Sequence, residues 1–348
     1  MENVVICGAA RTPIGGFQGA FDAVPAARLG GAAIEAALQQ TSLSSVDEVV
    51  MGNVLGAGQG QAPARQASFH AGLGAQVPAT TLNKMCGSGM KATMIGFDQI
   101  ALGQTQVMAV GGMESMSNAP YLLPKMRGGA RLGHSQVADH MFLDGLEDAY
   151  ENGRLMGSFA EDCAEKYQFT REAQDDYALR SLIRAREAQS SGAFENEITP
   201  FNLARKKGNY AVMQDEQPLN AKPEKIPHLK PAFRADGSVT AANASSISDG
   251  AAALIVSSQT HMQQAGLPCR ARILGHASHA QEPAWFSTAP IFATRKLLDR
   301  LNWRVEDVDL WEVNEAFAVV PMAFMNELDI SGDIINVHGG ACALGHPI

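Results

Sequence analysis

The order of strand-like and helix-like segments near the N terminus constrains the fold of this chain more than any other feature. Runs rich in β-branched residues at 3–7 and 46–54 flank an alanine-rich stretch with helical periodicity at 26–40. Strand–helix–strand alternation is typical of α/β proteins with a mostly parallel sheet. We therefore predict an α/β fold for residues 1–118, and the alternation of strand-like and helix-like segments resumes from residue 249.

The middle of the chain has a different composition. Residues 119–246 are rich in proline, glycine and charged residues, and they contain one long helical stretch at 170–191, for which Thr170 is a suitable N-cap. We interpret this segment as an insertion carried by the α/β unit. The predicted division is an N-terminal domain of residues 1–118 and 247–268, an inserted loop domain of residues 119–246, and a C-terminal domain of residues 269–348.

The last third of the chain resembles the first. VDEV at 46–49 recurs as VEDV at 305–308, and Cys86 and His346 follow these two stretches at nearly the same spacing. A duplicated βαβ unit would place both residues at sheet ends that lead into helices, facing each other. On spacing alone, a chance match of two short stretches is an equal alternative. The extended segments expected before the two residues are 79–83 and 334–337.

Charge and cysteine usage limit the function and the compartment. A net charge of −9 argues against a nucleic-acid partner, which would require a clustered basic face. Five widely spaced cysteines without a CxxC pair indicate reduced thiols and hence a cytoplasmic protein. We expect no signal peptide and no membrane contact. A local patch could still hold an anionic ligand, although solvated loop charge is the commoner explanation; the candidates are Lys125, Arg127 and Arg131, or Arg205, Lys206 and Lys207.

The stretch NKMCGSGM at 83–90 places Cys86 directly before a glycine-bearing turn and a helix-like run. A helix N terminus lowers the pKa of a thiol because its dipole and unpaired N–H groups favour the thiolate. Gly87 and Gly89 would leave room for a substrate and keep the Cys86 amide available to an oxyanion. These features favour a nucleophile, and a small buried apolar residue is the alternative.

Two further segments carry candidate polar groups. His346 lies between glycine and proline, where core packing explains it poorly, and it could take the proton of Cys86. A satisfied loop histidine is the alternative. The run WEVNEAFAVV at 311–320 sets Asn314 and Glu315 between apolar residues, so we expect both to be buried and hydrogen-bonded. A helix-capping Asn314 is the other interpretation.

The sequence lacks the motifs of several other kinds of functional site. The sequence contains no dinucleotide-binding glycine pattern, no Walker sequence and no GxSxG elbow. His134 with His140, and His276 with His279, have no further ligands at metal-binding spacing. We therefore expect no metal site and no tightly bound cofactor.

Taken together, the segments carry a family resemblance. The chain resembles the thiolase family, in particular its acetyl-CoA C-acetyltransferase (acetoacetyl-CoA thiolase) members, in the family's order over nearly the full length. The matching stretches are ARTPIGGF (10–17), PARQ (63–66), NKMCGSGMKA (83–92), GGMESMSNAPY (111–121), GLEDAY (145–150), TAANASSISDGAAA (240–253), EVNEAFA (312–318) and NVHGGACALGHPI (336–348).

The resemblance implies a thiolase fold, with two duplicated βαβαβαββ domains in a five-layered core and a loop domain over the substrate. It implies coenzyme A thioesters as substrates, with Cys86 as the acyl-accepting nucleophile and His346 as its activator. Asn314 would hold a water that, with His346, stabilises the thioester enolate. Family members are commonly homodimers or homotetramers, with loop 119–140 as the tetramer contact. The implied substrate-binding residues are Ser245 and Ala241 on the pantetheine arm, Met156 and Phe317 on the acyl pocket, and Phe233 and Leu146.

The chain also departs from the family pattern. The family continues beyond the last residue, Ile348, with a segment bearing a second cysteine that handles the α-proton, and Cys342 does not occupy that position. We expect this form to be acylated but to condense thioesters poorly. Leu155 stands where many members have histidine, and residues 215–220 lack an arginine that often binds the nucleotide. The alternatives are a decarboxylating β-ketoacyl synthase and a non-catalytic acyl-CoA-binding protein.

Overall fold

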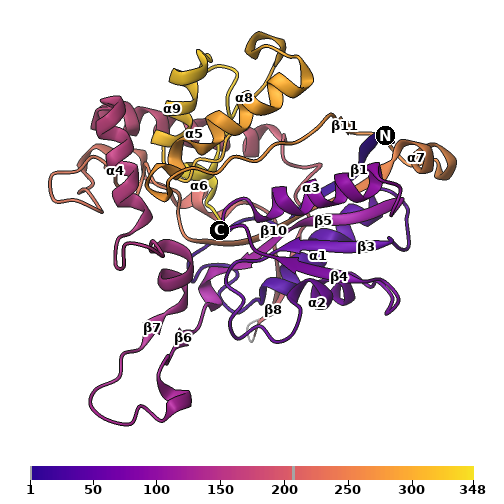
Figure 1. Ribbon diagram of the computed structural model, residues 1–348, viewed down its shortest axis with the longest axis horizontal. Coiled ribbons are helices and arrows are strands. Elements are labelled where there is room, and N and C mark those ends of the chain that lie inside the picture. The colour runs from indigo at the N-terminus through magenta and orange to yellow at the C-terminus, as the bar shows by residue number, and fades with distance from the viewer. Residues whose placement is uncertain (1, 206–207) are drawn as a thin grey trace.

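The computed structural model describes residues 2–205 and 208–348, and its centre is a mixed β-sheet (Figure 1). The strand order in this sheet is β11-β1-β10-β5-β3-β4, and β2 pairs with β10. The strands are β1 (Val4–Arg11), β2 (Gly15–Gly16), β3 (Glu48–Gly52), β4 (Ala79–Leu82), β5 (Val107–Ser115), β10 (Ser248–Ser258) and β11 (Ala271–Ile273).

Helices cover both faces of the sheet because the strands are apolar on both sides. In β3, Val49 and Met51 pack in the cluster formed with α1 (Ala26–Gln39) and α2 (Pro63–His70). The intervening Val50 packs in the opposite cluster, under α3 (Ser88–Ala101). Successive side chains of a strand point to opposite faces, so a strand buried on both faces reads as a continuous apolar run. The predicted strands and the helix at 26–40 are confirmed, with ends shifted by a few residues.

Strand β10 joins the first part of the chain to residues that follow the insertion. It lies between β1 and β5 and is antiparallel to both, whereas β3 is parallel to β4 and to β5. The carboxyl ends of β3, β4 and β5 and the start of β10 therefore lie at one edge of the sheet. On this pairing we propose the division into residues 1–118 with 247–268, 119–246 and 269–348, although β11 pairs with β1.

The predicted insertion, residues 119–246, extends from this sheet and contains the helices α4 (Met156–Tyr167), α5 (Arg171–Ser191) and α6 (Glu216–Asn220). Its hairpin of β6 (Tyr121–Leu122) and β7 (Ala138–Asp139) ends in a loop that projects far from the body (Figure 1). Thr170 caps the long helix as predicted, because its hydroxyl accepts a hydrogen bond from the Ala173 N–H at 3.1 Å. The remaining elements are β8 (Phe201–Arg205) and β9 (Gly208–Val212).

The C-terminal part repeats the order of the first part with shorter elements. Trp311 and Ile335 form a parallel bridge, as β3 and β4 do in the first half. The extended segment predicted at 334–337 is wrong in extent, since only Ile335 makes a strand-type bridge and the residues around it turn. The helices here are α8 (Ala289–Leu301), α9 (Val319–Leu328) and α10 (Ala341–Leu344), while α7 (Gln259–Ala265) follows β10 in the proposed N-terminal domain.

Short helical turns complete the chain. A π-helical turn spans Phe142–Leu146, and 3₁₀ turns span Met116–Asn118, Met126–Gly128, Pro223–His228, Pro283–Thr288 and Val305–Asp307.

Candidate active site

Cys86 lies in the connection from β4 to α3, at the sheet edge where the parallel strands end. Glycines allow the start of α3 to approach these strands closely. A Cβ on Gly52, the last residue of β3, would lie 2.5 Å from the Cβ of Ser88. A Cβ on Gly89 would lie 3.5 Å from the backbone of Gly111 and Gly112 in β5. The glycines of the NKMCGSGM stretch therefore bring the thiol against the carboxyl ends of the strands.

The turn that presents Cys86 is held by short side-chain contacts. The Ser88 hydroxyl accepts a hydrogen bond from the Lys84 N–H at 2.9 Å and donates to the Met85 carbonyl at 2.6 Å. The Asn83 side chain accepts the Met85 N–H at 2.9 Å. Met85 has a φ of +48°, a region that a side chain enters at a cost in energy. The contacts of Ser88 and Asn83, and not the conformational preference of Met85, therefore fix the backbone of this turn.

The Cys86 thiol is free and accessible at its surface, which a nucleophile requires. Surrounding protein nevertheless desolvates its charged form and raises the pKa of the thiol, against a smaller opposing effect of its own backbone N–H. The direction is opposite to the lowering expected from a helix N terminus. Cys86 is therefore a thiol at neutral pH, and its reaction requires a base.

His346 is brought to the same sheet edge from the other half of the chain. Its N–H donates to the Ser246 carbonyl at 3.0 Å, and it forms a parallel bridge with Ile247, next to the start of β10. The preceding Gly345 has a φ of +101°, so both this turn and the Cys86 turn follow a residue with positive φ. Burial lowers the pKa of His346 to about 4. At neutral pH its imidazole is uncharged and can accept a proton.

Asn314 lies beside His346, and its amide donates to the imidazole Nε2 at 3.3 Å. The expectation that Asn314 is buried is wrong, because Asn314 is exposed to solvent. It does not cap a helix either, since α9 has Ala318 at its N-cap. Its amide is therefore available to a water or a ligand as well as to His346.

Glu315 is fully buried, as expected, and it fixes the segment that carries Asn314. Its carboxylate accepts hydrogen bonds from the Tyr177 hydroxyl at 2.9 Å and the Ser181 hydroxyl at 2.7 Å, both on α5. It also accepts the Asn336 amide at 2.8 Å and the Cys342 N–H at 3.0 Å. These partners lie far apart in sequence, and no local signal predicts them. The carboxylate joins α5 to the loop that leads to His346.

Cys342 contributes to this buried network and not to an open thiol site. Its sulfur lies 3.7 Å from the Glu315 carbonyl, to which it donates. Burial and the adjacent Glu315 raise the pKa of Cys342 well above its usual range. That Cys342 is not a second catalytic thiol remains a prediction, and its raised pKa keeps it protonated at neutral pH.

Aromatic side chains from three parts of the chain form an apolar cluster near the Asn314 segment. The Phe317 ring meets the Phe233 ring edge-on at 6.0 Å and the Phe286 ring at 6.5 Å between centroids. Met156 packs in the same cluster. Gly157 is required here, because a Cβ would lie 2.3 Å from the Phe233 ring. Three predicted pocket residues are therefore together, and Phe286 joins them, although no sequence motif marked it.

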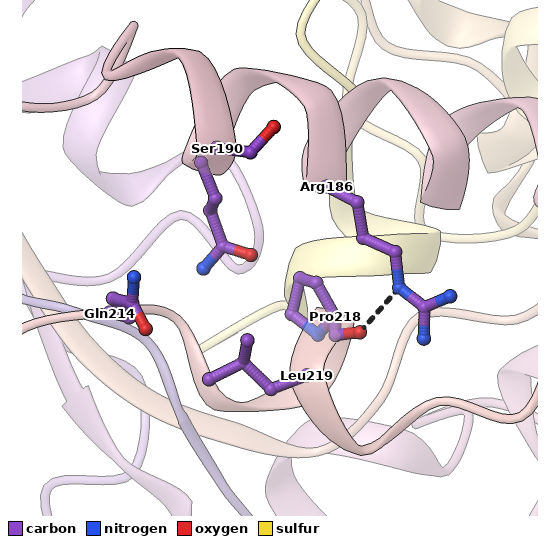
Figure 2. A pocket seen from close by; sticks show the side chains of 6 residues that line it. Arg186, Ser190, Gln214, Pro218 and Leu219 are labelled. Carbon is purple, nitrogen blue, oxygen red and sulfur yellow. Dashed lines mark hydrogen bonds between the residues drawn. The ribbon is translucent and has the colours of Figure 1, made fainter.

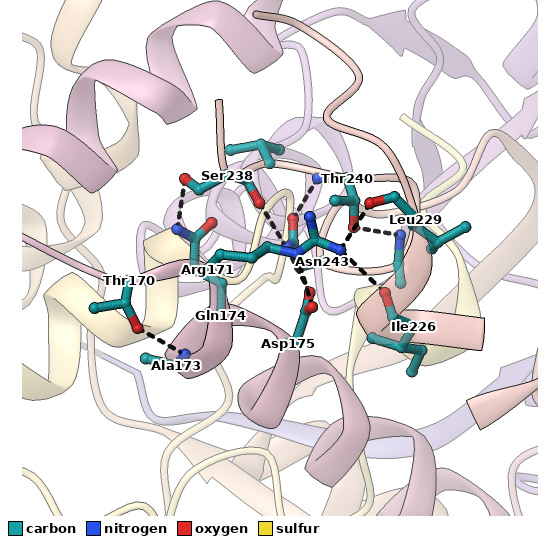
Figure 3. A network of polar contacts seen from close by, with 12 residues as sticks. Thr170, Arg171, Ala173, Gln174, Asp175, Ile226, Leu229, Ser238, Thr240 and Asn243 are labelled. Atoms are coloured by element: carbon teal, nitrogen blue, oxygen red, sulfur yellow. Dashed lines mark hydrogen bonds and ion pairs between the residues drawn. The ribbon is translucent and has the colours of Figure 1, made fainter. Parts of the chain in front are cut away.

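The segment predicted to contact the pantetheine arm lies alongside these aromatic residues. Ala244 bridges Phe317, and the Ser245 hydroxyl donates to the Ala316 carbonyl at 2.9 Å, while Ala241 is exposed. Figure 3 shows how α5 holds this segment, since Asp175 accepts the Asn243 amide at 3.0 Å.

Arg171 extends the same network to the turn at 223–228. It pairs with Asp175 at 2.7 Å and donates to the carbonyls of Ile226 and Leu229 at 3.0 and 2.9 Å (Figure 3). One partly buried ion pair on α5 thus holds both the turn at 223–228 and the segment around Asn243.

Leu146 belongs to a different cluster from the other predicted binding residues. It packs with Val54, Leu55 and Ile247 and with Ile348 near the C-terminal end. It therefore packs near the residues that flank the His346 segment and not in the aromatic cluster around Phe317.

The candidate catalytic residues share a sheet edge, and two cavities lie elsewhere in the molecule. Within the described ranges Cys86 makes no hydrogen bond with His346 or Asn314, and the three residues are related by the sheet edge that they share. A cavity of about 410 Å³ lies between α5 and α6, where Arg186 donates to the Pro218 carbonyl (Figure 2), and an adjoining cavity of about 720 Å³ reaches β9. Neither cavity is lined by a candidate catalytic residue.

The basic patch on the projecting loop is also separate from the site. Lys125, Arg127 and Arg131 are exposed on the projecting loop between β6 and β7 (Figure 1). In the other patch, Lys206 and Lys207 lie outside the described residues. Over residues 2–205 and 208–348, no group of three or more His, Cys, Asp or Glu side chains could hold a metal ion. In the same ranges, no helix is both long and apolar enough to cross a membrane.

An accessible thiol and a neutral imidazole at one sheet edge, with an apolar cluster beside the Asn314 segment, are the features of a thiol-dependent acyltransferase. The chain belongs to the thiolase family, and its fold is the thiolase fold. Residues 4–260 match the family described as "Thiolase, N-terminal domain", and residues 267–348 match "Thiolase, C-terminal domain".

Known proteins resemble the chain along almost all of its length. The acetyl-CoA acetyltransferase of Pseudomonas aeruginosa is 49% identical over 352 residues, covering 100% of this chain and 89% of that protein. Acetyl-CoA acetyltransferase 2 of Arabidopsis thaliana is 48% identical, with 100% and 87% covered. The solved structure of Acat5 thiolase from Ascaris suum in complex with coenzyme A has a TM-score of 0.94 at 40% identity, covering 99% of this chain and 89% of that one.

Proposed function

We propose that this chain is an acetyl-CoA C-acetyltransferase, which makes or cleaves acetoacetyl-CoA, or a longer 3-ketoacyl-CoA, through an acyl-cysteine. The observation that carries the proposal is the accessible Cys86 thiol at the sheet edge where the neutral His346 also lies. The names of the relatives and the coenzyme A bound to the Ascaris structure support the substrate class. The comparisons do not favour the synthase or the non-catalytic alternative.

The first half-reaction follows from the two protonation states. The Cys86 sulfur attacks the thioester carbonyl while His346 accepts the thiol proton. The Cys86 amide donates to the developing oxyanion. The carbon–sulfur bond to coenzyme A then breaks, and the proton on His346 passes to the departing thiolate. The products are an acyl-Cys86 enzyme and free coenzyme A.

The second half-reaction uses the polar group beside the imidazole. The enolate of a second acetyl thioester attacks the acyl-Cys86 carbonyl, the carbon–sulfur bond to Cys86 breaks, and the Cys86 thiolate regains a proton in place of the α-proton that the thioester lost. Asn314 holds a water that, with His346, donates to the enolate oxygen, so that the negative charge is stabilised as it develops. Removing one such donor typically costs about 3 kcal/mol of transition-state stabilisation. Phe317, Phe233 and Met156 enclose the acyl group and exclude water. Ser245, Ala241 and Leu146 lie along the path of the coenzyme A arm.

The function is tested by the thioester that the chain accepts. Purified protein is mixed with acetyl-CoA, acetoacetyl-CoA or malonyl-CoA, and free coenzyme A, acetyl-CoA and carbon dioxide are measured together with the intact protein mass. We expect one acetyl group on the protein and no carbon dioxide, with one equivalent of coenzyme A released from acetyl-CoA or one equivalent of acetyl-CoA formed from acetoacetyl-CoA. Acylation that occurs only with decarboxylation of malonyl-CoA would favour the synthase, and binding without any adduct would favour a non-catalytic protein.

We further infer a homodimer or homotetramer in the cytoplasm. The projecting loop between β6 and β7 exposes Tyr121, Leu123, Met126 and Leu132, and an apolar surface of this kind favours contact with a second copy. All five cysteines are free, which suits a reducing compartment. Analytical ultracentrifugation should give two or four times the chain mass, and a monomer at micromolar concentration would contradict the inference. Cell fractionation tests the compartment.

A further inference from the structure

Glu114 is a buried acid close to the catalytic edge of the sheet that the acyl transfer just described does not use. It is the penultimate residue of β5, and 1% of its surface is exposed. Its Oε2 accepts the Val54 N–H at 2.7 Å, and its Oε1 accepts the Asn53 amide at 2.7 Å and the Leu55 N–H at 3.3 Å. Burial, with a smaller contribution from Asp249, raises the pKa of Glu114 to about 7. A buried carboxylate with three donors from one turn fixes that turn firmly.

The turn held by Glu114, residues 53–55, is bonded to the segment that carries Cys86. The Asn53 N–H donates to the Leu82 carbonyl at 2.9 Å. The Val54 carbonyl accepts the Asn83 amide at 3.5 Å, and the other end of that amide accepts the Met85 N–H at 2.9 Å. Met85 directly precedes Cys86 and has the positive φ described above. A displacement of the 53–55 turn would therefore change the backbone that presents the thiol.

The same turn packs against the segment that carries His346. Leu55 shares an apolar cluster with Ile348 and Ile247. A Cβ on Gly145 would meet Leu55 at 3.4 Å and Ile348 at 3.3 Å, so the two side chains border the same small space. Ile247 is the bridge partner of His346, and Ile348 is two residues beyond it. The turn thus contacts both halves of the candidate catalytic pair.

We propose that Glu114 is a positioning residue for the acyl transfer: by fixing the 53–55 turn, it aligns the Cys86 sulfur with the His346 imidazole. The proposal rests on the proposed function. A carboxylate suits the task because two oxygens accept all three donors. Glutamine has one acceptor oxygen, and its NH₂ group would oppose one of the N–H groups.

The test compares wild-type protein with Glu114→Gln in single-turnover acylation by acetyl-CoA over a range of concentrations. A misplacement of about 1 Å can lower a rate on the order of 100-fold, so we expect the limiting acylation rate to fall about 10-fold or more. The half-saturating acetyl-CoA concentration should stay within about twofold, because Glu114 does not line the binding segment. A purely structural role would lower the melting temperature and leave the acylation rate of folded protein unchanged.

Asp215→Asn is the matched control. Asp215 is also a fully buried carboxylate, but its partners are Arg11 and the Ile14 N–H, away from the 53–55 turn. This variant should lower the melting temperature and keep the wild-type acylation rate. If it slows acylation as much as Glu114→Gln does, general loosening explains both, and the proposal is wrong.

Asn83→Ala provides a second route, since Asn83 is exposed and links the turn to Met85 without supporting the core. We expect it to slow acylation, and we expect the double variant with Glu114→Gln to be no slower than the slower single variant, because both act through one connection. If Glu114→Gln does not fold, an unchanged rate in Asn83→Ala overturns the proposal. A wild-type chain that forms no acyl-enzyme contradicts the proposed function itself, whereas equal acylation of wild type and Glu114→Gln contradicts only the positioning role.

Discussion

Cys86→Ala should abolish acyl-enzyme formation and lower the rate at which acetoacetyl-CoA and coenzyme A are converted to acetyl-CoA by roughly 10³-fold or more, as loss of a nucleophile does in other covalent enzymes. The thiol is the one atom to which the acyl group bonds, and its surface is accessible. Intact-protein mass spectrometry and an assay of acetoacetyl-CoA consumption measure the two effects. The melting temperature should change little, because an exposed side chain contributes little packing.

Cys269→Ala serves as the control for this substitution. Cys269 is the other exposed cysteine and lies before β11, outside the catalytic edge. We expect its adduct and its rate to stay within about twofold of wild type, since surface substitutions away from a site have small effects. An acetyl group that still appears on the Cys86→Ala protein would assign the nucleophile to another residue.

His346→Ala should lower the acylation rate by about 10² to 10⁴-fold, the usual contribution of a general base. His346→Asn should lose as much, because it can keep a polar contact with Asn314 but cannot take a proton. His279→Ala, a histidine stacked on Phe292 away from this edge, should retain the wild-type rate. Rapid-quench mass spectrometry of the three variants measures these rates.

The pH profile gives a second readout of His346. Its pKa is lowered from 6.5 to about 4, so the fraction of neutral base stays nearly constant from pH 8 down to about pH 5. Below that, protonation removes the base and the acylation rate should fall. An ordinary histidine would produce this fall near pH 6.5. Glu114, whose pKa is raised to about 7, also titrates in this range, so the profile is measured in Glu114→Gln as well as in wild type. An acid limb centred near pH 6.5 in both proteins would contradict the role of burial at His346.

Local signals in the sequence were sufficient to predict much of the secondary structure of this protein. The strands at 3–7 and 46–54 and the helix capped by Thr170 follow from periodicity and capping, which depend on near neighbours. Cys86 was recognisable because glycines surround it. The family resemblance supplied the roles of His346 and Asn314.

Other features escaped prediction because they depend on distant partners. The pKa of Cys86 is raised where the helix argument expected a lowered value, since desolvation by surrounding segments outweighs the local backbone. Asn314 is exposed because the chain folds Glu315, and not its neighbour, toward α5. Phe286 joins the aromatic cluster around Phe317 from a segment without a motif.

The sequence by itself determined the α/β class, and it supplied the hypotheses of an inserted loop domain and of Cys86 and His346 as reactive groups, because these depend on residue type and on spacing over a few turns. Only the tertiary structure decided that Cys86 and His346 share one sheet edge, and that Glu114 holds the turn between them. Those relations come from strand order and from burial of polar groups, which arise when segments hundreds of residues apart pack together.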